Sequence, residues 1–521
     1  MSSDFEIAAN PIIPMSSYRT LNTFLSETAV RWPDHPALIE GGATLTWAEL
    51  NQASARVASA LLRRGARPGD RVAVCAPKTG RIVAAIHGVL KAGCVCVPID
   101  PASPAVRAQA VLEDCDPVAI IGSAEALPNL LASSSRVRIS IDQGVEEALS
   151  WQEVMVGELV PLTAAVQLSD LAYLLYTSGS TGQPKGVMLS HENVSAFATW
   201  AAEEFQLAPE DRVASVAPLH FDLSTFDLYS TARSGATLCI PAALHLSFPV
   251  RLTDWLAAER ISIMYTVPSL LAMIAERGDI KTKKMDDLRL LLFAGEVCPP
   301  RLLSGLLDLL PDVEFANLYG PTETNVCTFE RIDRKRWDRV TPISIGVPCD
   351  GTRIVLVDDA GAAIDGSGMA GELLVSGPTV ALGYWRDSAK SALRFIQRAG
   401  ERWCRTGDYA EFDDADRLVF HGRRDHMVKI RGHRVELGDV EAALLAHPGV
   451  AEAAVVAVDE VLVAFARPSG PEISSDELRE HCAQRLPRYM VPAEMKLLQT
   501  MPHGSTGKID RLALQRMAKH E

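Results

Sequence analysis

The sequence has no excess of basic residues and no apolar run long enough to cross a membrane. Its 65 Asp and Glu residues outnumber its 51 Lys and Arg residues, which gives a formal net charge of −14. A nucleic-acid-binding surface requires clustered Lys and Arg side chains that neutralise phosphates, so this charge argues against a nucleic-acid partner. A membrane-spanning helix requires about 20 consecutive apolar residues. We therefore expect neither a nucleic-acid nor a membrane partner.

Signals for secretion and for a metal or disulfide framework are also missing. The stretch from Met1 through Asp4 and Glu6 has no basic segment followed by an apolar run, so we expect no secretory signal. The 10 cysteines are scattered, and the single close pair, Cys94 and Cys96, has no second pair at metal-ligand spacing. Buried thiols in a reducing compartment are expected, rather than zinc ligands or disulfides. The sequence thus predicts a cytoplasmic enzyme.

The composition and the order of the apolar runs predict a large α/β fold. Hydrophobic residues make up 48% of the 521 residues and charged residues 22%, a balance typical of globular proteins. Alternating helical and strand patterns favour layers with largely parallel sheets, whose ligand sites lie at the carboxyl ends of strands. Helices are expected over Trp47 to Leu61 and Ile82 to Leu90, and buried strands over Arg71 to Cys75, Cys94 to Ile99, Leu171 to Leu175, Ile261 to Val267, Leu288 to Phe293 and Val313 to Leu318.

The composition changes near Gly422, where a short stretch rich in Arg and Lys begins. Two strand-like runs follow, Ala453 to Val458 and Val461 to Ala466, and then a helix whose start is marked by Ser474 and Ser475. These elements predict a small α+β domain of about a hundred residues. We therefore predict a large domain, residues 1–424, and a small domain, residues 425–521.

A segment rich in glycine and hydroxyl residues directly follows the apolar run Leu171 to Leu175. Glycines let the backbone approach an anion, hydroxyls donate to phosphate oxygens, and a lysine adds a positive charge. The segment is not a Walker loop, because Lys185 precedes a glycine rather than Ser or Thr. The alternative is a flexible turn. The residues predicted to hold phosphates are Thr177, Ser178, Gly179, Ser180, Thr181, Gly182 and Lys185.

This loop resembles the signature of the adenylate-forming superfamily, which includes amino-acid adenylation domains, acyl-CoA synthetases and luciferases. Further motifs of that superfamily follow in the expected order between Lys91 and Arg511. They are Lys91-Ala92-Gly93, Pro98-Ile99-Asp100-Pro101, Phe221-Asp222-Leu223-Ser224, Ala294-Gly295-Glu296, Asn317-Leu318-Tyr319-Gly320-Pro321-Thr322-Glu323, Gly371-Glu372-Leu373, Gly383-Tyr384-Trp385, Arg405-Thr406-Gly407-Asp408, Gly422-Arg423-Arg424-Asp425 and Gly507-Lys508-Ile509-Asp510-Arg511. The resemblance implies a large N-terminal domain of sheets and helices, a small mobile C-terminal domain, and ATP and Mg²⁺ as cofactors.

The resemblance also implies the first half-reaction, in which a carboxylate attacks the α-phosphate of ATP and pyrophosphate leaves. Lys508 would be the principal catalytic residue, because a long ammonium can bridge the carboxylate and the developing charge on the phosphate. Glu323 would bind Mg²⁺ and Thr322 a phosphate. His220 would act as an aromatic gate at the carboxylate site; the alternative is a satisfied core histidine.

The remaining nucleotide contacts also come from the resemblance. Asn317 and Tyr319 would contact adenine, the latter by stacking. Asp408 would accept hydrogen bonds from the ribose hydroxyls, with Arg423 beside it. Gly295 and Glu296 complete the predicted nucleotide-binding set. Thr506 departs from the family, which often has Asn at that position.

A second half-reaction is implied, in which a thiol takes the acyl group. In the family a hinge at the Asp matching Asp425 rotates the small domain, and Gly432 would lie where the thiol arm passes close to backbone. The basic stretch from Lys429 to Glu436 is either a solvated face or a contact for the phosphopantetheine phosphate or an acidic carrier. The chain ends ten residues after Arg511, so we expect a separate phosphopantetheinylated carrier protein.

Asp222 decides between classes of acid. In amino-acid adenylation domains the matching Asp pairs with the α-ammonium of the substrate, whereas fatty and aryl acids carry no such charge. A carboxylate in an apolar pocket is costly unless it is paired. The alternative is a helix-capping Asp beside Ser224. The prediction is therefore an amino acid, and the first alternative is an acyl- or aryl-CoA synthetase.

The residues carried over from the family's pocket are uncharged, which indicates a small to medium apolar amino acid. The set resembles the pocket of stand-alone L-proline ligases that load a carrier protein in pyrrole biosynthesis. Valine, cysteine and pipecolate stay open, because one methylene is worth only about 1–3 kcal/mol. A luciferase-like oxidoreductase and a non-catalytic nucleotide binder are further alternatives. Beside Asp222, the predicted substrate-binding residues are Leu223, Phe226, Tyr265, Leu292, Ala294, Leu318, Val326 and Cys327.

Overall fold

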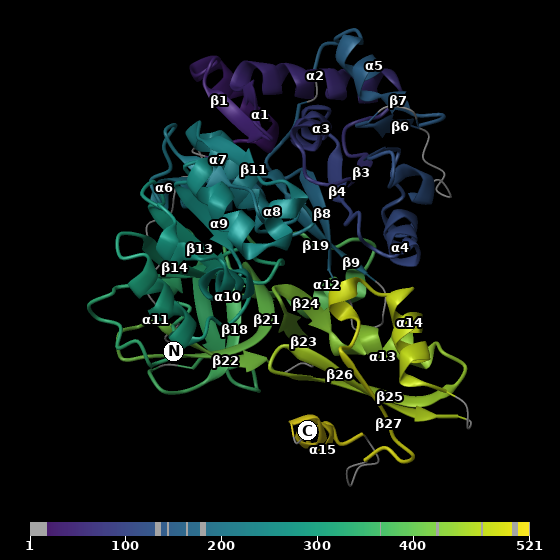
Figure 1. Cartoon of the computed structure of the whole chain (residues 1–521), viewed down its shortest axis with the longest axis vertical. Coiled ribbons are helices and arrows are strands. Elements are labelled where there is room, and N and C mark those ends of the chain that lie inside the picture. The colour runs from purple at the N-terminus through teal and green to yellow at the C-terminus, as the bar shows by residue number, and fades with distance from the viewer. Residues whose placement is uncertain are drawn as a thin grey trace.

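The computed structural model describes residues 18–130, 137–142, 145–162, 165–177, 184–364, 366–423, 427–469, 473–502 and 509–519. Residues up to 423 form three sheets and the helices that pack on them, and residues from 427 onward form a smaller α+β part (Figure 1). The predicted α/β class, with a large N-terminal domain and a small C-terminal one, is thus confirmed. The predicted boundary between residues 424 and 425 lies outside the described residues and stays a prediction.

The first sheet of the large domain has a parallel centre and an antiparallel edge. Among the described residues it has eight strands, in the order β19, β9, β8, β4, β3, β5, β6, β7. Strands β3 to β8 pair parallel with one another. Strand β9 pairs antiparallel with β8 on one side and with β19 on the other. Their bounds are β3 (Arg71–Cys75), β4 (Val95–Pro98), β5 (Ala119–Gly122), β6 (Val137–Ser140), β7 (Leu149–Ser150), β8 (Leu171–Thr177), β9 (Lys185–Ser190) and β19 (Gly383–Tyr384).

The second sheet has nine strands within the described ranges, in the order β16, β15, β14, β13, β12, β10, β11, β1, β2. Its middle strands, β1 and β10 to β14, pair parallel, so their carboxyl ends meet at one edge. The bounds are β1 (Pro36–Glu40), β2 (Ala43–Thr46), β10 (Arg212–Ala214), β11 (Thr237–Ile240), β12 (Ile263–Thr266), β13 (Leu290–Ala294), β14 (Glu314–Tyr319), β15 (Thr328–Arg331) and β16 (Val347–Pro348).

The third sheet is antiparallel, which the sequence pattern did not predict. In the described chain it runs β17, β18, β21, β20, with β22 paired to β21. Except for β18, which is buried throughout, its strands contain partly or fully exposed residues, unlike a parallel strand that is buried on both faces. The bounds are β17 (Arg353–Val357), β18 (Gly371–Ser376), β20 (Phe395–Arg398), β21 (Glu401–Phe412) and β22 (Leu418–Arg423).

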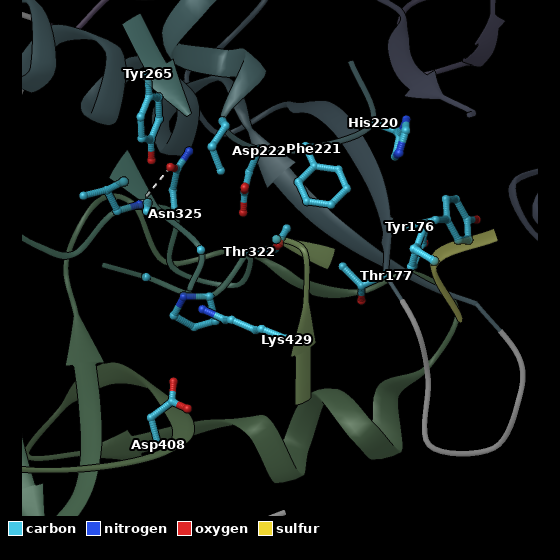
Figure 2. Close-up of a pocket in the computed structure, with 18 of the residues that line it drawn as sticks. Tyr176, Thr177, His220, Phe221, Asp222, Tyr265, Thr322, Asn325, Asp408 and Lys429 are labelled. Atoms are coloured by element: carbon cyan, nitrogen blue, oxygen red, sulfur yellow. Dashed lines mark hydrogen bonds between the residues drawn. The ribbon is translucent and has the colours of Figure 1, made fainter. Parts of the chain in front are cut away.

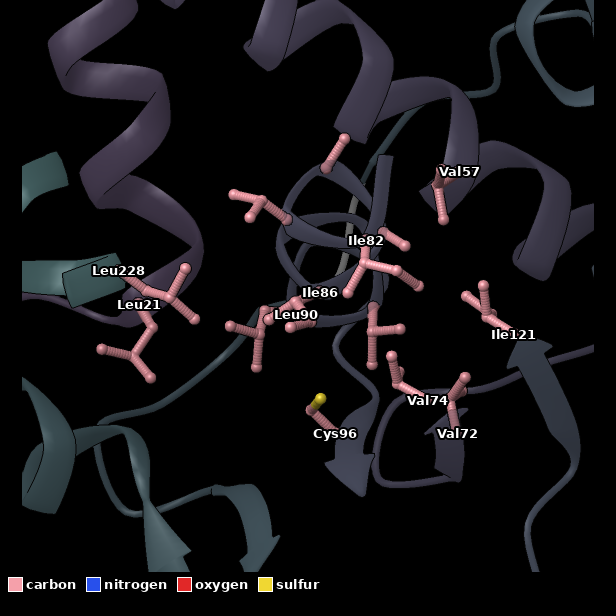
Figure 3. Packing of buried hydrophobic residues seen from close by; sticks show 14 of the residues in the cluster. Leu21, Val57, Val72, Val74, Ile82, Ile86, Leu90, Cys96, Ile121 and Leu228 are labelled. Atoms are coloured by element: carbon pink, nitrogen blue, oxygen red, sulfur yellow. The ribbon is translucent and has the colours of Figure 1, made fainter. Parts of the chain in front are cut away.

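Three N-terminal helices, α1 (Leu21–Arg31), α2 (Trp47–Arg63) and α3 (Gly80–Lys91), pack in a core shared with both large sheets (Figure 3). Helix α3 is apolar around most of its circumference because neighbours cover it on all sides. Gly88 allows α3 to approach α2 closely: a Cβ there would lie 2.6 Å from the Cβ of Val57. At the start of α2, Thr46 and Glu49 form a capping box, which is worth about 1 kcal/mol per cap.

The other helices of the large domain also pack against the sheets. Several begin with a proline in the first turn, where its missing N–H costs nothing. A short π-helix, η3 (Phe226–Ser230), precedes α7, and π-helical turns are frequent at functional sites. The helices are α4 (Ala105–Cys115), α5 (Trp151–Val156), α6 (His191–Glu204), α7 (Thr231–Ser234), α8 (Ala243–Ser247), α9 (Pro249–Ala258), α10 (Pro268–Arg277), α11 (Pro300–Leu309) and α12 (Ser388–Arg394), with the 3₁₀ turns η2 (Leu127–Leu130) and η4 (Ile280–Thr282).

The small C-terminal part contains a hairpin and a three-stranded sheet in the described chain. The hairpin β23–β24 lies against the large domain, whereas α15 lies at the far end of the molecule (Figure 1). Ser474 caps α14, as predicted, by accepting from the backbone N–H of Glu477 at 3.1 Å. The elements are β23 (Met427–Ile430), β24 (His433–Glu436), α13 (Leu437–Leu445), β25 (Val450–Val458), β26 (Val461–Pro468), α14 (Ser475–Ala483), η5 (Arg488–Met490), β27 (Glu494–Leu497) and α15 (Arg511–Lys519).

The sequence analysis made predictions about the cysteines and about membrane-spanning helices. All ten cysteines are free and buried, as expected for small apolar side chains. No helix in the described ranges is both long enough and apolar enough to cross a membrane.

Candidate active site

A cavity opens at the carboxyl ends of β12, β13 and β14, where the large domain meets the β23–β24 hairpin (Figure 2). Parallel strands place their ligand sites at this edge, so the sheet topology alone explains the location. Of the predicted site residues, those that line the cavity are Thr177, His220, Asp222, Leu223, Tyr265, Ala294, Gly295, Thr322, Val326, Asp408, Arg423 and Gly432.

Asp222 supplies the carboxylate at the apolar end of the cavity. Figure 2 shows its side chain directed into the cavity near Thr322, with Lys429 extending in from the opposite side. Burial raises the pKa of Asp222, and the hydrogen bond to Thr322 and the charge of Lys429 oppose the increase. The site therefore favours a cation close to Asp222, because an ionised carboxylate in a buried environment needs a partner.

The turn that carries Asp222 is held by local hydrogen bonds. The Ser224 hydroxyl donates to the carbonyl of Phe221 at 2.6 Å, and the Thr225 hydroxyl donates to the carbonyl of Asp222 at 2.6 Å. The π-helix η3 follows at once, and its first residue, Phe226, packs edge-on against Tyr265 with 5.4 Å between ring centroids. This arrangement points the Asp222 side chain inward and fixes one wall of the cavity.

Asp408 lies at the opposite end of the cavity and bridges two predicted nucleotide contacts. Its carboxylate accepts a hydrogen bond from the Tyr319 hydroxyl and another from Arg423 Nη1 at 2.7 Å. Arg423 also donates to the carbonyl of Thr406 at 3.1 Å. The three predicted residues therefore form one buried network, although Tyr319 does not itself line the cavity described here.

The side of the cavity nearest the phosphate segment has one unpaired donor in the described structure. Thr177 lines the cavity at the end of β8, and its buried hydroxyl has no hydrogen-bond partner among the described residues. Lys185, by contrast, forms an ion pair with Glu436 of β24, with 2.8 Å between Nζ and Oε1. Glu296 accepts a hydrogen bond from the backbone N–H of Ser269 at 2.7 Å.

Several predicted residues lie behind the cavity wall rather than on it, as far as the described chain extends. Glu323 is fully buried, 2.5 Å from the Tyr384 hydroxyl and 3.8 Å from Arg394. Asn317 donates to the carbonyl of Ser344 at 2.8 Å. The apolar residues in this second layer are Phe226, Leu292, Leu318 and Cys327. They support the wall without lining the cavity.

Some predicted residues cannot be placed. Ser178, Gly179, Ser180, Thr181 and Gly182 lie outside the described residues. The same holds for Asp425 and Lys508. The described neighbours of Lys508 pack on the β25–β26 sheet, where Ile509 contacts the apolar cluster of Met501 and Leu514.

The cavity also contains Asn325 and Tyr489, which sequence reasoning did not assign to it, and Lys429, which belongs to the basic stretch predicted to act in the second half-reaction. Asn325 has a left-handed backbone with φ of 49° and donates to the Thr225 hydroxyl at 3.3 Å. Lys429 and Tyr489 come from the small domain and reach the cavity only because the two domains meet there. The sequence offered a local indication for Asn325, since Asn tolerates a left-handed backbone in turns. It offered no indication for Tyr489.

Comparison with known families agrees with this geometry. Residues 25–385 match the family described as AMP-binding enzyme, and residues 439–508 match the AMP-binding enzyme C-terminal domain. The chain belongs to the AMP-binding enzyme family. The first match covers more than half of the chain and includes the cavity residues of the large domain up to Val326. The protein is thus an adenylate-forming ligase, and ligases of this kind use ATP.

Two relatives of this AMP-binding enzyme share nearly its whole length. An L-proline--[L-prolyl-carrier protein] ligase of Pseudomonas fluorescens is 40% identical over 511 residues, covering 96% of this chain and 100% of that protein. A protein of the same description from Streptomyces coelicolor is 38% identical over 509 residues, covering 93% of this chain and 94% of that protein.

A solved structure supports the fold. The amide bond synthetase McbA from Marinactinospora thermotolerans has a TM-score of 0.85 with this AMP-binding enzyme at 23% identity, covering 96% of this chain and 99% of that chain. At this level of identity the likeness concerns the fold alone.

Proposed function

We propose that this enzyme activates L-proline as prolyl-AMP, releases pyrophosphate, and transfers the prolyl group to the phosphopantetheine thiol of a separate carrier protein. The observation that supports this most directly is Asp222, a carboxylate directed into a cavity whose other near neighbours include Leu223, Tyr265, Ala294 and Val326. A compact amino acid places its ammonium beside the carboxylate and its ring against the apolar wall. The two L-proline ligases described above share nearly the full length of the chain.

The nucleotide is proposed to occupy the part of the cavity between Thr177 and Asp408. Thr177 offers an unpaired hydroxyl to phosphate oxygens, and the Asp408 carboxylate has lone pairs left for the ribose hydroxyls beside Arg423. The oxygen of the amino-acid carboxylate then attacks the α-phosphate between the two groups. Lys508 is proposed to bridge the attacking carboxylate and that phosphate, because its ammonium offsets the charge that develops there.

Mg²⁺ is proposed to accompany the nucleotide. The described residues contain no group of three or more candidate metal ligands, but Mg²⁺ commonly takes one or two carboxylates and completes its shell with phosphates and waters. Glu323, next to Thr322, would be that carboxylate, and the ion would neutralise phosphate charge. Arg394 compensates the charge of Glu323 in the structure described here.

The second half-reaction is proposed to use the domain arrangement of this structure. A second cavity shares Phe221 and Leu223 with the first, and Arg431 and His433 of the small domain line it. A thiol arm entering beside the exposed Arg431 would reach the carbonyl carbon of the adenylate through this passage, with Arg431 near the phosphate of the arm. Asp425 is proposed as the hinge that brings the small domain into place. The cytoplasmic location predicted from the sequence stays a prediction.

The complete reaction is tested by mass spectrometry of a phosphopantetheinylated carrier protein incubated with enzyme, ATP, Mg²⁺ and an equimolar mixture of amino acids. The carrier is expected to gain the mass of one prolyl group, and the gain should disappear when ATP is omitted. A carrier loaded with a different amino acid would refute the substrate, and formation of free prolyl-AMP without any loading would refute the transfer step.

Gly432 is expected to be required for transfer but not for adenylation. Its φ is +80°, and a Cβ there would lie 2.7 Å from the Val267 side chain of the large domain. Left-handed strain and overpacking together cost about 2–3 kcal/mol, so Gly432→Ala should slow carrier loading by about 10- to 100-fold. Amino-acid-dependent exchange of pyrophosphate into ATP should stay near its original rate.

Gly400→Ala is the matched control, because Gly400 also has a φ of +80° but no atom within 4 Å of the added Cβ. It should leave loading unchanged. Adding Val267→Ala to Gly432→Ala should recover part of the lost loading rate, since it removes the contact. An equal fall in exchange and loading for Gly432→Ala would contradict the assignment.

A further inference from the structure

The loop that carries Asp222 borders open space along its length, although Val216, Ala217 and Leu223 are buried in apolar clusters. Every residue from Ser215 to Leu223 lines at least one of three cavities: the active-site cavity, the adjoining passage, or a third cavity that Lys78 also lines. Side chains that border open space make fewer van der Waals contacts than those in a filled core. Polar contacts at the ends of this loop therefore add to what holds Asp222 in position.

Lys78 supplies such contacts from outside the active site. It lies in the connection between β3 and α3, and it lines only the third cavity among these. Its Nζ donates to the Ser215 hydroxyl at 2.8 Å, to the Ser215 carbonyl at 3.0 Å, and to the carbonyl of Ala217. All three donor positions of the ammonium are thus used on the first residues of the loop.

The same ammonium is tied to the end of the loop. Asp227, in the π-helix that follows Asp222, is fully buried, and its carboxylate lies 3.7 Å from Lys78 Nζ. The Ser215 hydroxyl donates to Asp227 Oδ2 at 3.0 Å. Burial raises the pKa of Asp227 and lowers that of Lys78, and each charge opposes the shift of the other. Lys78 therefore joins the start of the loop to the helix after it.

We propose that Lys78 is a positioning residue for amino-acid recognition: by clamping Ser215, Ala217 and Asp227, it holds the loop so that Asp222 faces the substrate ammonium. Lys78 is not within the active-site cavity and touches no reacting atom. Lys78 follows β3 of the first large sheet, whereas the loop follows β10 of the second. The clamp thus fixes one sheet to the substrate-binding loop of the other. This inference rests on the proposed function.

A purely structural role would produce a different result. Removing a buried lysine lowers stability wherever it leaves a buried carboxylate unpaired. A positioning role adds a selective loss of amino-acid binding, because the loop leads to Asp222 and not to the nucleotide contacts Asp408 and Arg423. The ratio of the KM values for amino acid and ATP separates the two roles.

The test measures pyrophosphate–ATP exchange for Lys78→Met, with KM determined separately for L-proline and ATP. Methionine keeps the unbranched shape and removes the three donors. Since hydrogen bonds to charged groups are worth about 1.5–3 kcal/mol, the KM for L-proline should rise by about 10- to 100-fold. The KM for ATP should change little.

Two further variants make the outcome decisive. Lys91→Met is the matched control: Lys91 is also buried, and it donates to the Asn51 carbonyl at 3.2 Å, far from the loop. It should leave the ratio of KM values unchanged. Lys78→Met combined with Asp227→Asn removes the unpaired charge, so thermal stability should recover while the KM for L-proline stays high.

The proposal is overturned if the two KM values change together in Lys78→Met, or if the double variant restores the KM for L-proline. Failure of the proposed function is recognised separately, in the unmodified enzyme. If that enzyme exchanges pyrophosphate with another amino acid instead of L-proline, the substrate proposal is wrong, and the clamp is tested with the amino acid that it does activate.

Discussion

Replacing Asp222 by alanine is expected to lower kcat/KM for L-proline by about 10²- to 10³-fold, because breaking a buried ion pair costs about 3–5 kcal/mol. The ammonium of the substrate would lose the carboxylate that faces it. Exchange kinetics at several concentrations of L-proline measure this loss. The KM for ATP should be nearly unaffected, since Asp222 lies at the other end of the cavity from Asp408.

The same variant should also change what the enzyme rejects. Cyclopentanecarboxylate has the shape of proline without its nitrogen, and in the unmodified enzyme it would leave Asp222 buried and unpaired. The ratio of activities with L-proline and this analogue should therefore fall in Asp222→Ala. Asp414→Asn, which removes an exposed carboxylate of the same domain, should leave the ratio unchanged. An unmodified enzyme that prefers the analogue would be an acid–thiol ligase of another class.

Replacing Lys508 by alanine is expected to reduce adenylation by about 10²- to 10³-fold, the usual effect of removing one group that stabilises transition-state charge. The prediction rests on the matching motif at the end of the chain, because Lys508 lies outside the described residues. Transfer from chemically prepared prolyl-AMP to the carrier thiol should be retained, since Lys429 and Gly432 of the small domain line the cavity in this arrangement. Single-turnover assays of the two half-reactions distinguish them.

Lys519→Ala provides the comparison for Lys508→Ala, because Lys519 is exposed on α15 of the same domain. It should slow neither half-reaction. A Lys508→Ala enzyme that loses both half-reactions equally, or neither, would show that the two steps do not use separate faces of the small domain.

The parts of the fold that could be predicted are those with local signals. Strand β3 matches the predicted bounds of Arg71–Cys75 because a parallel strand buried on both faces forms a continuous apolar run. Helix α14 begins directly after Ser474, the residue predicted to mark its start. The antiparallel sheet of β17, β18, β20, β21 and β22 was missed because its strands, apart from the buried β18, are partly exposed and pair with partners known only from the folded structure.

The site residues that belong to sequence motifs could be predicted. The contacts between segments that are distant in the sequence could not. Asp222, Thr322 and Asp408 line one cavity as the resemblance implied. No local pattern could have indicated that Lys185 pairs with Glu436, 251 positions away, or that Tyr489 reaches the same cavity. Both contacts depend on how the small domain rests against the large one.

Some residues of the predicted motifs make contacts that a sequence does not reveal. Asn317 was predicted to contact adenine, yet its amide donates to the carbonyl of Ser344. Glu323 was predicted to bind Mg²⁺, and in this arrangement it is buried beside Arg394. Their roles stay predictions, because only a nucleotide complex reports which contacts form during adenylation.

The most direct test of the account is amino-acid-dependent exchange of labelled pyrophosphate into ATP with the unmodified enzyme. The panel contains the proteinogenic amino acids, pipecolate, salicylate and fatty acids. The account predicts the strongest exchange with L-proline and weaker exchange with other compact apolar amino acids, because a substrate must both pair with Asp222 and fit the apolar wall of the cavity. Exchange confined to acids that lack an amine would contradict it.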